Sequence, residues 1–176
     1  MKKIRLSAEM MRNDKKRGEW AELVFAYRAM ERGLRLWRPW GESCGYDWII
    51  EQESGNFARV QVKSTTFSEG DGYSCSLKDS KGVYKKNTFD FVAAYVIPVD
   101  VWYILPEKLV RGMWSVGLHP ELTKSKYGDY QEAWHLLRRE NASAHKKTAG
   151  VPHKERTRSK IGKDTSSTRA APAMPV

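Results

Sequence analysis

The chain has 176 residues, of which 31 are Lys or Arg and 21 are Asp or Glu, so its formal net charge at pH 7 is +10. Hydrophobic residues make up 40% of it, with seven Trp, eight Tyr and five Phe, which is enough for a buried core and excludes a fully disordered protein. The longest nearly apolar run, residues 91–99, is far shorter than the roughly 20 residues that cross a bilayer, and two cysteines are too few for a disulfide framework.

The basic residues are concentrated near the C-terminus. Residues 141–176 hold eight Lys or Arg against two acids, a net charge of +6, and contain no aromatic residue. Such a segment buries too little apolar surface to fold by itself, so the sequence predicts a domain over residues 1–140 and a disordered basic tail over 141–176. The tail either adds contacts to phosphate groups or only improves solubility. Because the N-terminus lacks the apolar stretch of a secretory signal, we expect a soluble, cytoplasmic protein.

The first predicted element is a helix over residues 15–33. Its apolar side chains recur at helical intervals and predict one buried stripe, formed by Trp20, Leu23, Val24, Tyr27 and Met30. Gly33 is a typical stop signal after a helix. The short apolar stretch 34–37 and a loop over 38–45 follow.

Strands dominate the rest of the chain. The apolar patterns predict strands over 46–51, 57–66, 73–77, 89–97 and 101–105. Gly-containing turns separate them at 54–56 and 69–72. A final helix is predicted over about 130–139. The order of helix, four or five strands and helix predicts an α/β (α+β) fold with a central mixed sheet.

Three polar residues stand out on the first two predicted strands, 46–51 and 57–66: Asp47, Gln61 and Lys63. Because side chains alternate along a strand, Gln61 and Lys63 share one face of the strand that follows the turn at 54–56. If the strands on both sides of this turn form a hairpin, Asp47 lies level with Gln61 and Lys63. The pairing would bring a carboxylate, an amide and an ammonium group together.

This pattern resembles a known family. Asp47 followed by Gln61-Val62-Lys63 is similar to the D…(D/E/Q)-x-K core of the PD-(D/E)XK nuclease superfamily. Glu22 in the first helix resembles the helix glutamate of the branch that includes Holliday-junction resolvases and group I intron-encoded endonucleases. The Q-x-K variant and the later segment 102–106, W-Y-I-L-P, look most like the intron-encoded branch. The resemblance covers residues 17–106 and implies a restriction-endonuclease-like fold.

The resemblance implies a metal-dependent endodeoxyribonuclease that uses Mg²⁺, with Mn²⁺ as a possible substitute. Asp47 would be the central metal ligand, with the side-chain carbonyl of Gln61, the backbone carbonyl of Val62 and the carboxylate of Glu22 as further ligands. Lys63 would orient the attacking water or stabilise the transition state. A neutral Gln in place of the family's usual acid predicts weaker metal binding and a greater dependence on Glu22.

Other polar residues are candidates for contacts to nucleic acid. The predicted phosphate contacts are Arg59, Ser64, Lys81, Lys85 and Lys86. Each of these residues is equally typical of a solvated surface, and Gln61 and Lys63 would also suit the solvated face of an edge strand. Trp37 and Trp40, in and near the loop over 38–45, suggest a dimer patch or a wedge for a DNA groove.

Two functions of different classes follow from the sequence. The first is a nuclease that cleaves duplex or branched DNA and acts as a homodimer or larger homo-oligomer, because a duplex has two strands to cut. The second is a catalytically weak or inactive module on the same fold, whose net charge of +10 serves to bind nucleic acid. Neither function involves a membrane. The sequence does not separate DNA from RNA as the substrate.

Overall fold

The computed structural model describes residues 12–138, apart from residues 42–43, 80–81 and 123. The predicted tail over 141–176 and Lys81 lie outside these described residues, so the domain boundary near residue 140 stays a prediction. Within the described ranges, no helix is both long enough and apolar enough to cross a membrane.

The structure contains one long helix, several short helical turns and a set of mostly short strands. The helices are α2 (Asp14–Glu31) and α3 (Glu107–Val110), with 3-10 turns η1 (Ile97–Val99), η2 (Gly128–Tyr130) and η3 (Trp134–Leu137). The strands are β1 (Arg35–Trp37), β2 (Trp48–Glu51), β3 (Phe57–Thr65), β4 (Ser68–Glu69), β5 (Gly72–Ser76), β6 (Lys78–Asp79), β7 (Gly82–Val83), β8 (Phe91–Val96), β9 (Val101–Pro106) and β10 (Ser115–Leu118).

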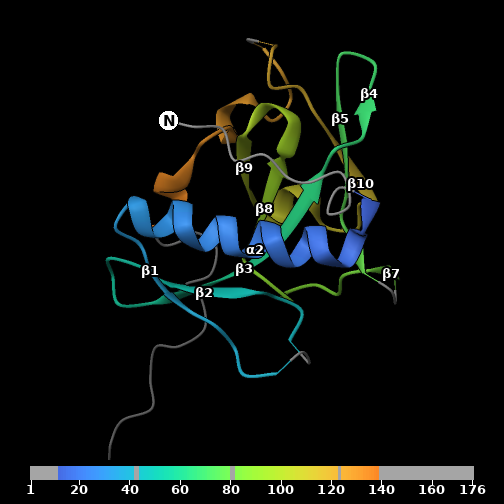
Figure 1. The fold of residues 1–176 in the computed structure, drawn as a ribbon. Helices are drawn as coiled ribbons and strands as arrows, with labels where there is room; N and C mark the ends of the chain where they lie inside the picture. The colour runs from blue at the N-terminus through green and yellow to red at the C-terminus, as the bar shows by residue number, and fades with distance from the viewer. Residues whose placement is uncertain (1–11, 42–43, 80–81, 123, 139–176) are drawn as a thin grey trace, which may run out of the picture. The chain divides into compact units, whose positions relative to one another are not determined.

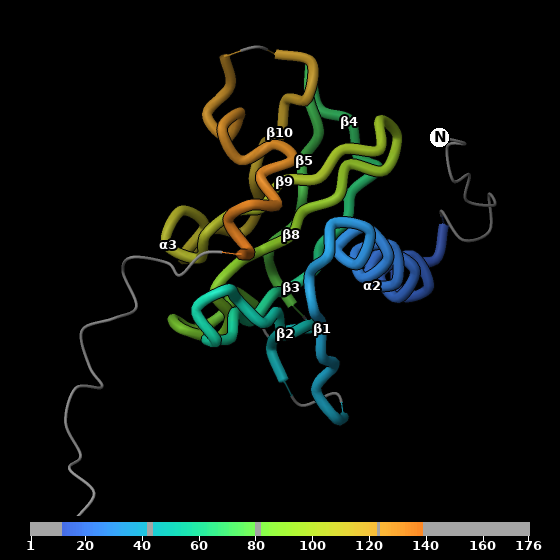
Figure 2. Tube along the Cα trace, turned by 90° about the vertical axis from the view of Figure 1, so that its left-hand side faces the viewer, coloured from blue at the N-terminus to red at the C-terminus, as the bar shows by residue number. Residues whose placement is uncertain are grey.

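The central sheet has five strands in the order β1-β2-β3-β8-β9. It is mixed, because β3 and β8 run parallel while the other neighbours are antiparallel. Helix α2 crosses one face of the sheet (Figure 1) and α3 lies on the other side (Figure 2). Two separate clusters of buried apolar residues fill these two faces. The observed fold confirms the predicted α+β class with a central mixed sheet.

Helix α2 begins and ends where the sequence predicts. The side chain of Asn13 caps its first turn by accepting a hydrogen bond of 3.0 Å from the backbone N–H of Lys16. At the other end, Gly33 has a φ of +71°, and the N–H of Leu34 donates to the carbonyl of Ala29 at 3.0 Å. A left-handed residue that closes such a bond ends the helix, and glycine adopts this conformation at low cost.

The predicted buried stripe is wrong, because a different face of this helix is buried. Leu23, Tyr27 and Met30 are exposed by 59, 51 and 66%, although Val24 is buried as expected and Trp20 is half-buried. The buried face consists of Ala21, Val24, Phe25, Arg28 and Ala29. The alanines at this face let the helix backbone lie close to the sheet, and Phe25 is its one large apolar side chain, fully buried. Leu23, Tyr27 and Met30 are left on the surface.

The hairpin formed by β2 and β3 confirms the predicted pairing. Gly55 supplies the positive φ of the turn, at +83°, and the strands pair with Trp48 opposite Val60. Just before β2, the backbone N–H of Asp47 donates to the carbonyl of Val60 at 2.9 Å. This register places Asp47 beside Gln61 and Val62, as the hairpin hypothesis requires.

The predicted helix over 130–139 is wrong. The segment forms the two 3-10 turns η2 and η3, because Glu132 between them has a φ of +50°, outside the helical region. Its N–H donates to the carbonyl of Trp102 at 2.8 Å, and its carboxylate accepts from the N–H of Trp102 and the indole N–H of Trp134, both at 2.7 Å. Because of these bonds, the backbone at Glu132 does not continue as a helix. The strand β10, which the sequence analysis missed, pairs with β5.

Candidate active site

Asp47 lies where the chain enters β2, and β3 fixes its carboxylate. One oxygen, Oδ2, accepts hydrogen bonds of 2.6 Å from the backbone N–H of Val62 and from the side-chain amide of Gln61. Burial raises the pKa of Asp47, although the bond from Val62 and the charge of Lys63 oppose the rise. The backbone of β3 therefore holds this carboxylate in one position at a cost in solvation.

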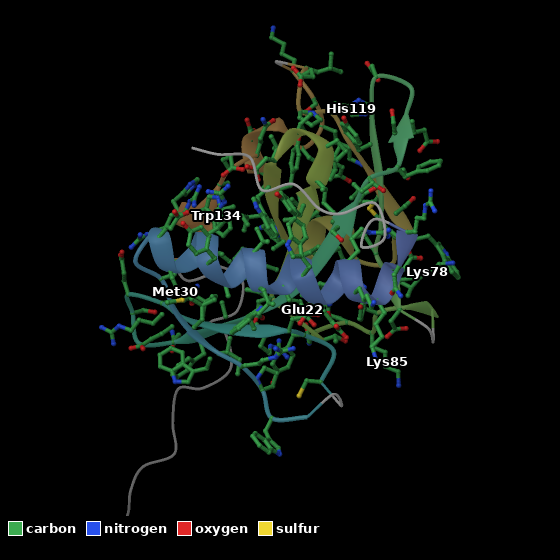
Figure 3. All side chains as sticks on the ribbon, viewed as in Figure 1. Glu22, Met30, Lys78, Lys85, His119 and Trp134 are labelled. Atoms are coloured by element: carbon green, nitrogen blue, oxygen red, sulfur yellow. The ribbon has the colours of Figure 1, made fainter. Side chains whose placement is uncertain are left out.

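Glu22 comes from the middle of α2 (Figure 3) and has a strongly perturbed carboxyl group. Burial, followed by the negative charge of Asp47, raises the pKa of Glu22 to about 7. Arg38 opposes this rise through an ion pair in which its Nη2 lies 3.0 Å from Oε2 of Glu22. Helix α2 and the segment that leads into β2 therefore each contribute one carboxylate to the same region.

Both carboxylates line one cleft. It has a volume of about 520 Å³ and lies between the N-terminal half of α2 and the loop at residues 38–47. Besides Glu22 and Asp47, its walls include Lys15 from the helix and Tyr46 from the loop. The lining holds four acidic and two basic residues, so a cation can reach the carboxylates from solvent: Asp14, Glu19, Glu22, Asp47, Lys15 and Arg38.

Lys63 is on the same side of β3 as Gln61 and is electrostatically coupled to both acids. Burial lowers its pKa, while the charges of Asp47 and, more weakly, Glu22 raise it. Its Nζ donates to the backbone carbonyl of Lys78 at 3.1 Å and lies 5.1 Å from the ring centre of Tyr84. The carbonyl and the aromatic face hold the ammonium group in one position.

Gln61 contributes an amide that is 7% exposed. Its Nε2 donates to Asp47 and also lies 3.2 Å from the backbone carbonyl of Val62. In this orientation the amide N–H₂, and not the carbonyl, faces the carboxylate. A half-turn of the amide exchanges the two groups, so the same side chain can present its oxygen to a cation.

These donors fit a hard divalent cation. Within the described part of the chain, no group of three or more His, Cys, Asp or Glu residues is placed to hold a metal ion. The groups that Asp47 and its neighbours offer are the carboxylates of Glu22 and Asp47, the amide oxygen of Gln61 and the carbonyl of Val62, all of them oxygens. Mg²⁺ prefers oxygen ligands and keeps several waters, so a site with few protein donors suits it. A cation would also relieve the repulsion that raises the pKa of Glu22.

The residues predicted to contact nucleic acid differ in their surroundings and exposure. The guanidinium of Arg59 is bound to Asp90 at 3.0 and 3.1 Å and to the carbonyl of Asn87 at 2.7 Å, so we assign it a structural role. Ser64 is half-buried and, by strand alternation, lies on the face of β3 opposite to Lys63. Lys85 and Lys86 are exposed, and Lys81 is outside the described residues.

Sequence reasoning missed three groups that support the site. Arg38 binds Glu22 from a loop, and Tyr84 and the carbonyl of Lys78 hold Lys63. Arg38 is 16 residues from its partner, and a backbone carbonyl carries no sequence signal, so neither contact could be inferred from helical or strand spacing. Among the exposed aromatics, Trp40 is fully exposed and Trp37 packs edge-on against Phe57, with ring centres 5.7 Å apart.

Comparisons with known proteins agree with this geometry. Residues 12–137 match a family model described as PD-(D/E)XK endonuclease. Among solved structures, the chain is similar to a bacterial homing endonuclease, I-Ssp6803I, with a TM-score of 0.61 and 28% sequence identity. The similarity covers 71% of this chain and 91% of that chain. No curated protein matches the chain in sequence. The family match spans every residue of the candidate site.

Proposed function

The chain belongs to the PD-(D/E)XK endonuclease family, and on this premise we propose that it is a metal-dependent endodeoxyribonuclease. Its substrate is duplex or branched DNA, in which it hydrolyses phosphodiester bonds with an activated water molecule. The observation that supports this proposal most strongly is the pair of half-buried carboxylates, Glu22 and Asp47, that line one cleft. Asp47 is bound to β3, the strand that carries Lys63.

The proposed cofactor is Mg²⁺, with Mn²⁺ as a substitute. Asp47 and Glu22 would hold it, together with the amide oxygen of Gln61 and the backbone carbonyl of Val62. When bound, the cation supplies the acidity that activates water and the positive charge that offsets charge developing on the phosphate. The uncharged Gln61 supplies less attraction than an acid would, so the site depends on Glu22 for its second negative charge.

The chain's own groups have separate tasks in this proposal. The bonds from Val62 and Gln61 to Asp47 fix the direction in which its free oxygen faces the cleft. Arg38 holds Glu22 at the cleft and limits the repulsion between the two acids. Lys63, confined by Tyr84 and the Lys78 carbonyl, stabilises negative charge on the phosphate oxygens or orients the attacking water.

A plasmid-nicking assay tests the proposal. The protein should convert supercoiled plasmid to open circles in Mg²⁺ or Mn²⁺ and not in EDTA. Lys63→Ala should lower the rate by about 10²–10³-fold, the effect expected when one group that stabilises the transition state is removed. Lys108→Ala, which changes an exposed lysine of α3, is the control and should affect the rate little.

A DNA-binding module without activity is the second candidate. It is favoured by the neutral Gln61 and by the ion pair between Arg38 and Glu22, which already offsets part of the negative charge at the cleft. For such a module, the wild-type protein would not nick plasmid with either ion, while salt-sensitive DNA binding would survive in the Lys63→Ala variant. Metal-dependent nicking that disappears in that variant would exclude it.

A further inference from the structure

The outward face of α2 carries large apolar side chains that nothing in the described structure covers. Leu23, Tyr27 and Met30 are more than half exposed and succeed one another at intervals of four and three residues. Figure 1 shows the helix lying in front of the sheet, and the three residues lie on the side of α2 opposite to its buried face. Residues at such intervals form one continuous stripe, and a contiguous exposed apolar stripe is typical of an interaction surface.

The stripe is symmetric about its centre. Lys16 and Glu19 continue it toward the N-terminus, so its positions 16, 19, 23, 27 and 30 follow at intervals of three, four, four and three residues. Because the intervals are the same from both ends, an antiparallel copy of the helix presents the same pattern in reverse. Leu23 would then meet Leu23 of the second copy, and each Lys16 would lie opposite Met30.

We propose that this face of α2 is the interface of a two-fold symmetric dimer, in which the α2 helices of two copies pack antiparallel and centred on Leu23. Charge supports the antiparallel direction. Lys16 of one copy comes next to Met30 and Glu31 of the other, so a cation at the N-terminal end of the stripe meets an anion that also pairs with Arg28 of its own chain at 3.3 Å. The stem of Lys16 also covers the apolar side chain of Met30.

The position of the cleft supports the same direction, and this step rests on the proposed nuclease function. Successive residues of a helix are turned by about 100°, so Lys15 and Glu22, which line the cleft, project from one flank of the stripe. Glu19 and Leu23 of the stripe also line the cleft, so the cleft adjoins the proposed interface. In an antiparallel pair, the two-fold axis is perpendicular to the helices, and both clefts open on the same side. One duplex can then reach both sites. In a parallel pair the two clefts would open on opposite sides.

Sedimentation of the full chain over a range of concentrations tests the interface. The wild-type mass should approach twice the 20.3 kDa of one chain. Met30→Arg, which places a cation against Lys16 of the partner, should return it to the mass of a single chain with an unchanged circular dichroism spectrum. Phe67→Arg is the matched control, because Phe67 is 65% exposed but lies outside α2, and it should leave the dimer intact.

A charge exchange tests the direction of the helices. In an antiparallel pair, Lys16→Glu combined with Met30→Arg puts opposite charges together again and should restore the dimer. In a parallel pair, positions 16 and 30 of the two copies are about 21 Å apart along the helix axis, and no rescue can occur. A double variant that stays monomeric would overturn the antiparallel arrangement.

The sedimentation experiment also distinguishes the proposed dimer from other segments that could cover the stripe. If the wild-type chain is monomeric and forms dimers only after removal of residues 1–11, then the chain's own N-terminal segment covers the stripe and the proposal is wrong. A monomer in every variant, also when bound to DNA, would equally overturn it.

The interface and the nuclease function can fail separately. Met30 does not line the cleft, so the monomeric Met30→Arg variant should still nick plasmid but lose paired cutting of both strands. A wild-type dimer that never nicks DNA would contradict the nuclease function and leave the interface standing. A wild-type monomer that nicks would contradict only the interface.

Discussion

At the scale of single residues, Glu22 and Asp47 are more costly to ionise in the folded protein than in the unfolded chain. Burial and the proximity of Asp47 raise the pKa of Glu22 to about 7 from its usual 4.5. Between these two pH values the folded state binds more protons than the unfolded state, so stability falls as the pH rises through this window. A bound cation would reverse the effect by favouring both anions.

This sign gives a prediction for Glu22→Gln. In EDTA, the melting temperature of the variant minus that of the wild type should be larger at pH 7.5 than at pH 4.5. The reason is that the variant lacks the carboxylate that opposes folding at higher pH. The ion pair with Arg38 is partly exposed, so losing it should cost little. Thermal denaturation followed by circular dichroism measures the difference. Melting curves that shift in parallel over this pH range would show that Glu22 is not perturbed.

A second residue-scale prediction concerns Asp47. Asp47→Asn keeps the size of the side chain and an oxygen that can accept the bond from Val62, but it removes the negative charge. Cleavage should fall to background, while DNA binding should stay the same or tighten, because the phosphate no longer meets this carboxylate. Fluorescence anisotropy with a labelled duplex measures the binding. Weaker binding in the variant would count against a metal-binding role for Asp47.

At the scale of elements, a polar contact joins α2 to the connection between β8 and β9. Asp100 has a φ of +57°, accepts a bond of 2.6 Å from the hydroxyl of Tyr95, and pairs with Arg28 at 2.9 Å. The guanidinium of Arg28 is almost buried, so the loss of Asp100 would remove its shorter ion pair and leave the one with Glu31 at 3.3 Å among its remaining contacts. This contact fixes the helix that carries Glu22 relative to the sheet.

Asp100→Ala should therefore destabilise the protein by about 2 kcal/mol, the range expected for hydrogen bonds to a charged group. Asp100→Asn tolerates the positive φ and keeps an acceptor for Tyr95, so it should lose clearly less. Urea denaturation gives both free energies of unfolding. If the two variants are equally stable, the side-chain contacts of Asp100 do not hold the helix.

The elements differ in how far the sequence could predict them. The ends of α2 and the β2–β3 hairpin follow from local signals, Asn13 and Gly33 for the helix and Gly55 for the turn. The buried face of α2 was mispredicted because periodicity locates stripes but does not say which stripe faces the sheet. The helix expected over 130–139 fails at Glu132, whose bonds to Trp102 depend on tertiary structure.

In the candidate site too, contacts within the hairpin could be predicted and contacts between separate elements could not. Strand alternation and the hairpin turn predicted that Asp47 and Gln61 come together, and the structure confirms their contact. Nothing local in the sequence indicated that Arg38 would bind Glu22, or that Tyr84 would lie beside Lys63, because these contacts join separate elements. The ion pair between Arg59 and Asp90 could not be predicted either, since Asp90 comes from a distant segment, and the contact of Arg59 with nucleic acid stays a prediction.

At the scale of the whole molecule, the net charge of +10 is the feature most relevant to DNA binding. Residues 141–176 carry +6 of it. Removing them should weaken binding and flatten the dependence of affinity on salt, because fewer counterions are released from the phosphates. Plasmid nicking at low salt should continue. Anisotropy titrations at several salt concentrations measure the slope, and an unchanged slope would show that this segment does not contact DNA.

Binding of Mn²⁺, followed by isothermal titration calorimetry, tests most directly whether Glu22, Asp47 and Gln61 form one metal site. We predict a single site in the wild-type protein that is lost in Asp47→Asn, weakened in Glu22→Gln and tightened in Gln61→Glu, with no change in the surface control Glu69→Gln. Equal Mn²⁺ affinity in the wild-type protein and in Asp47→Asn would contradict the account.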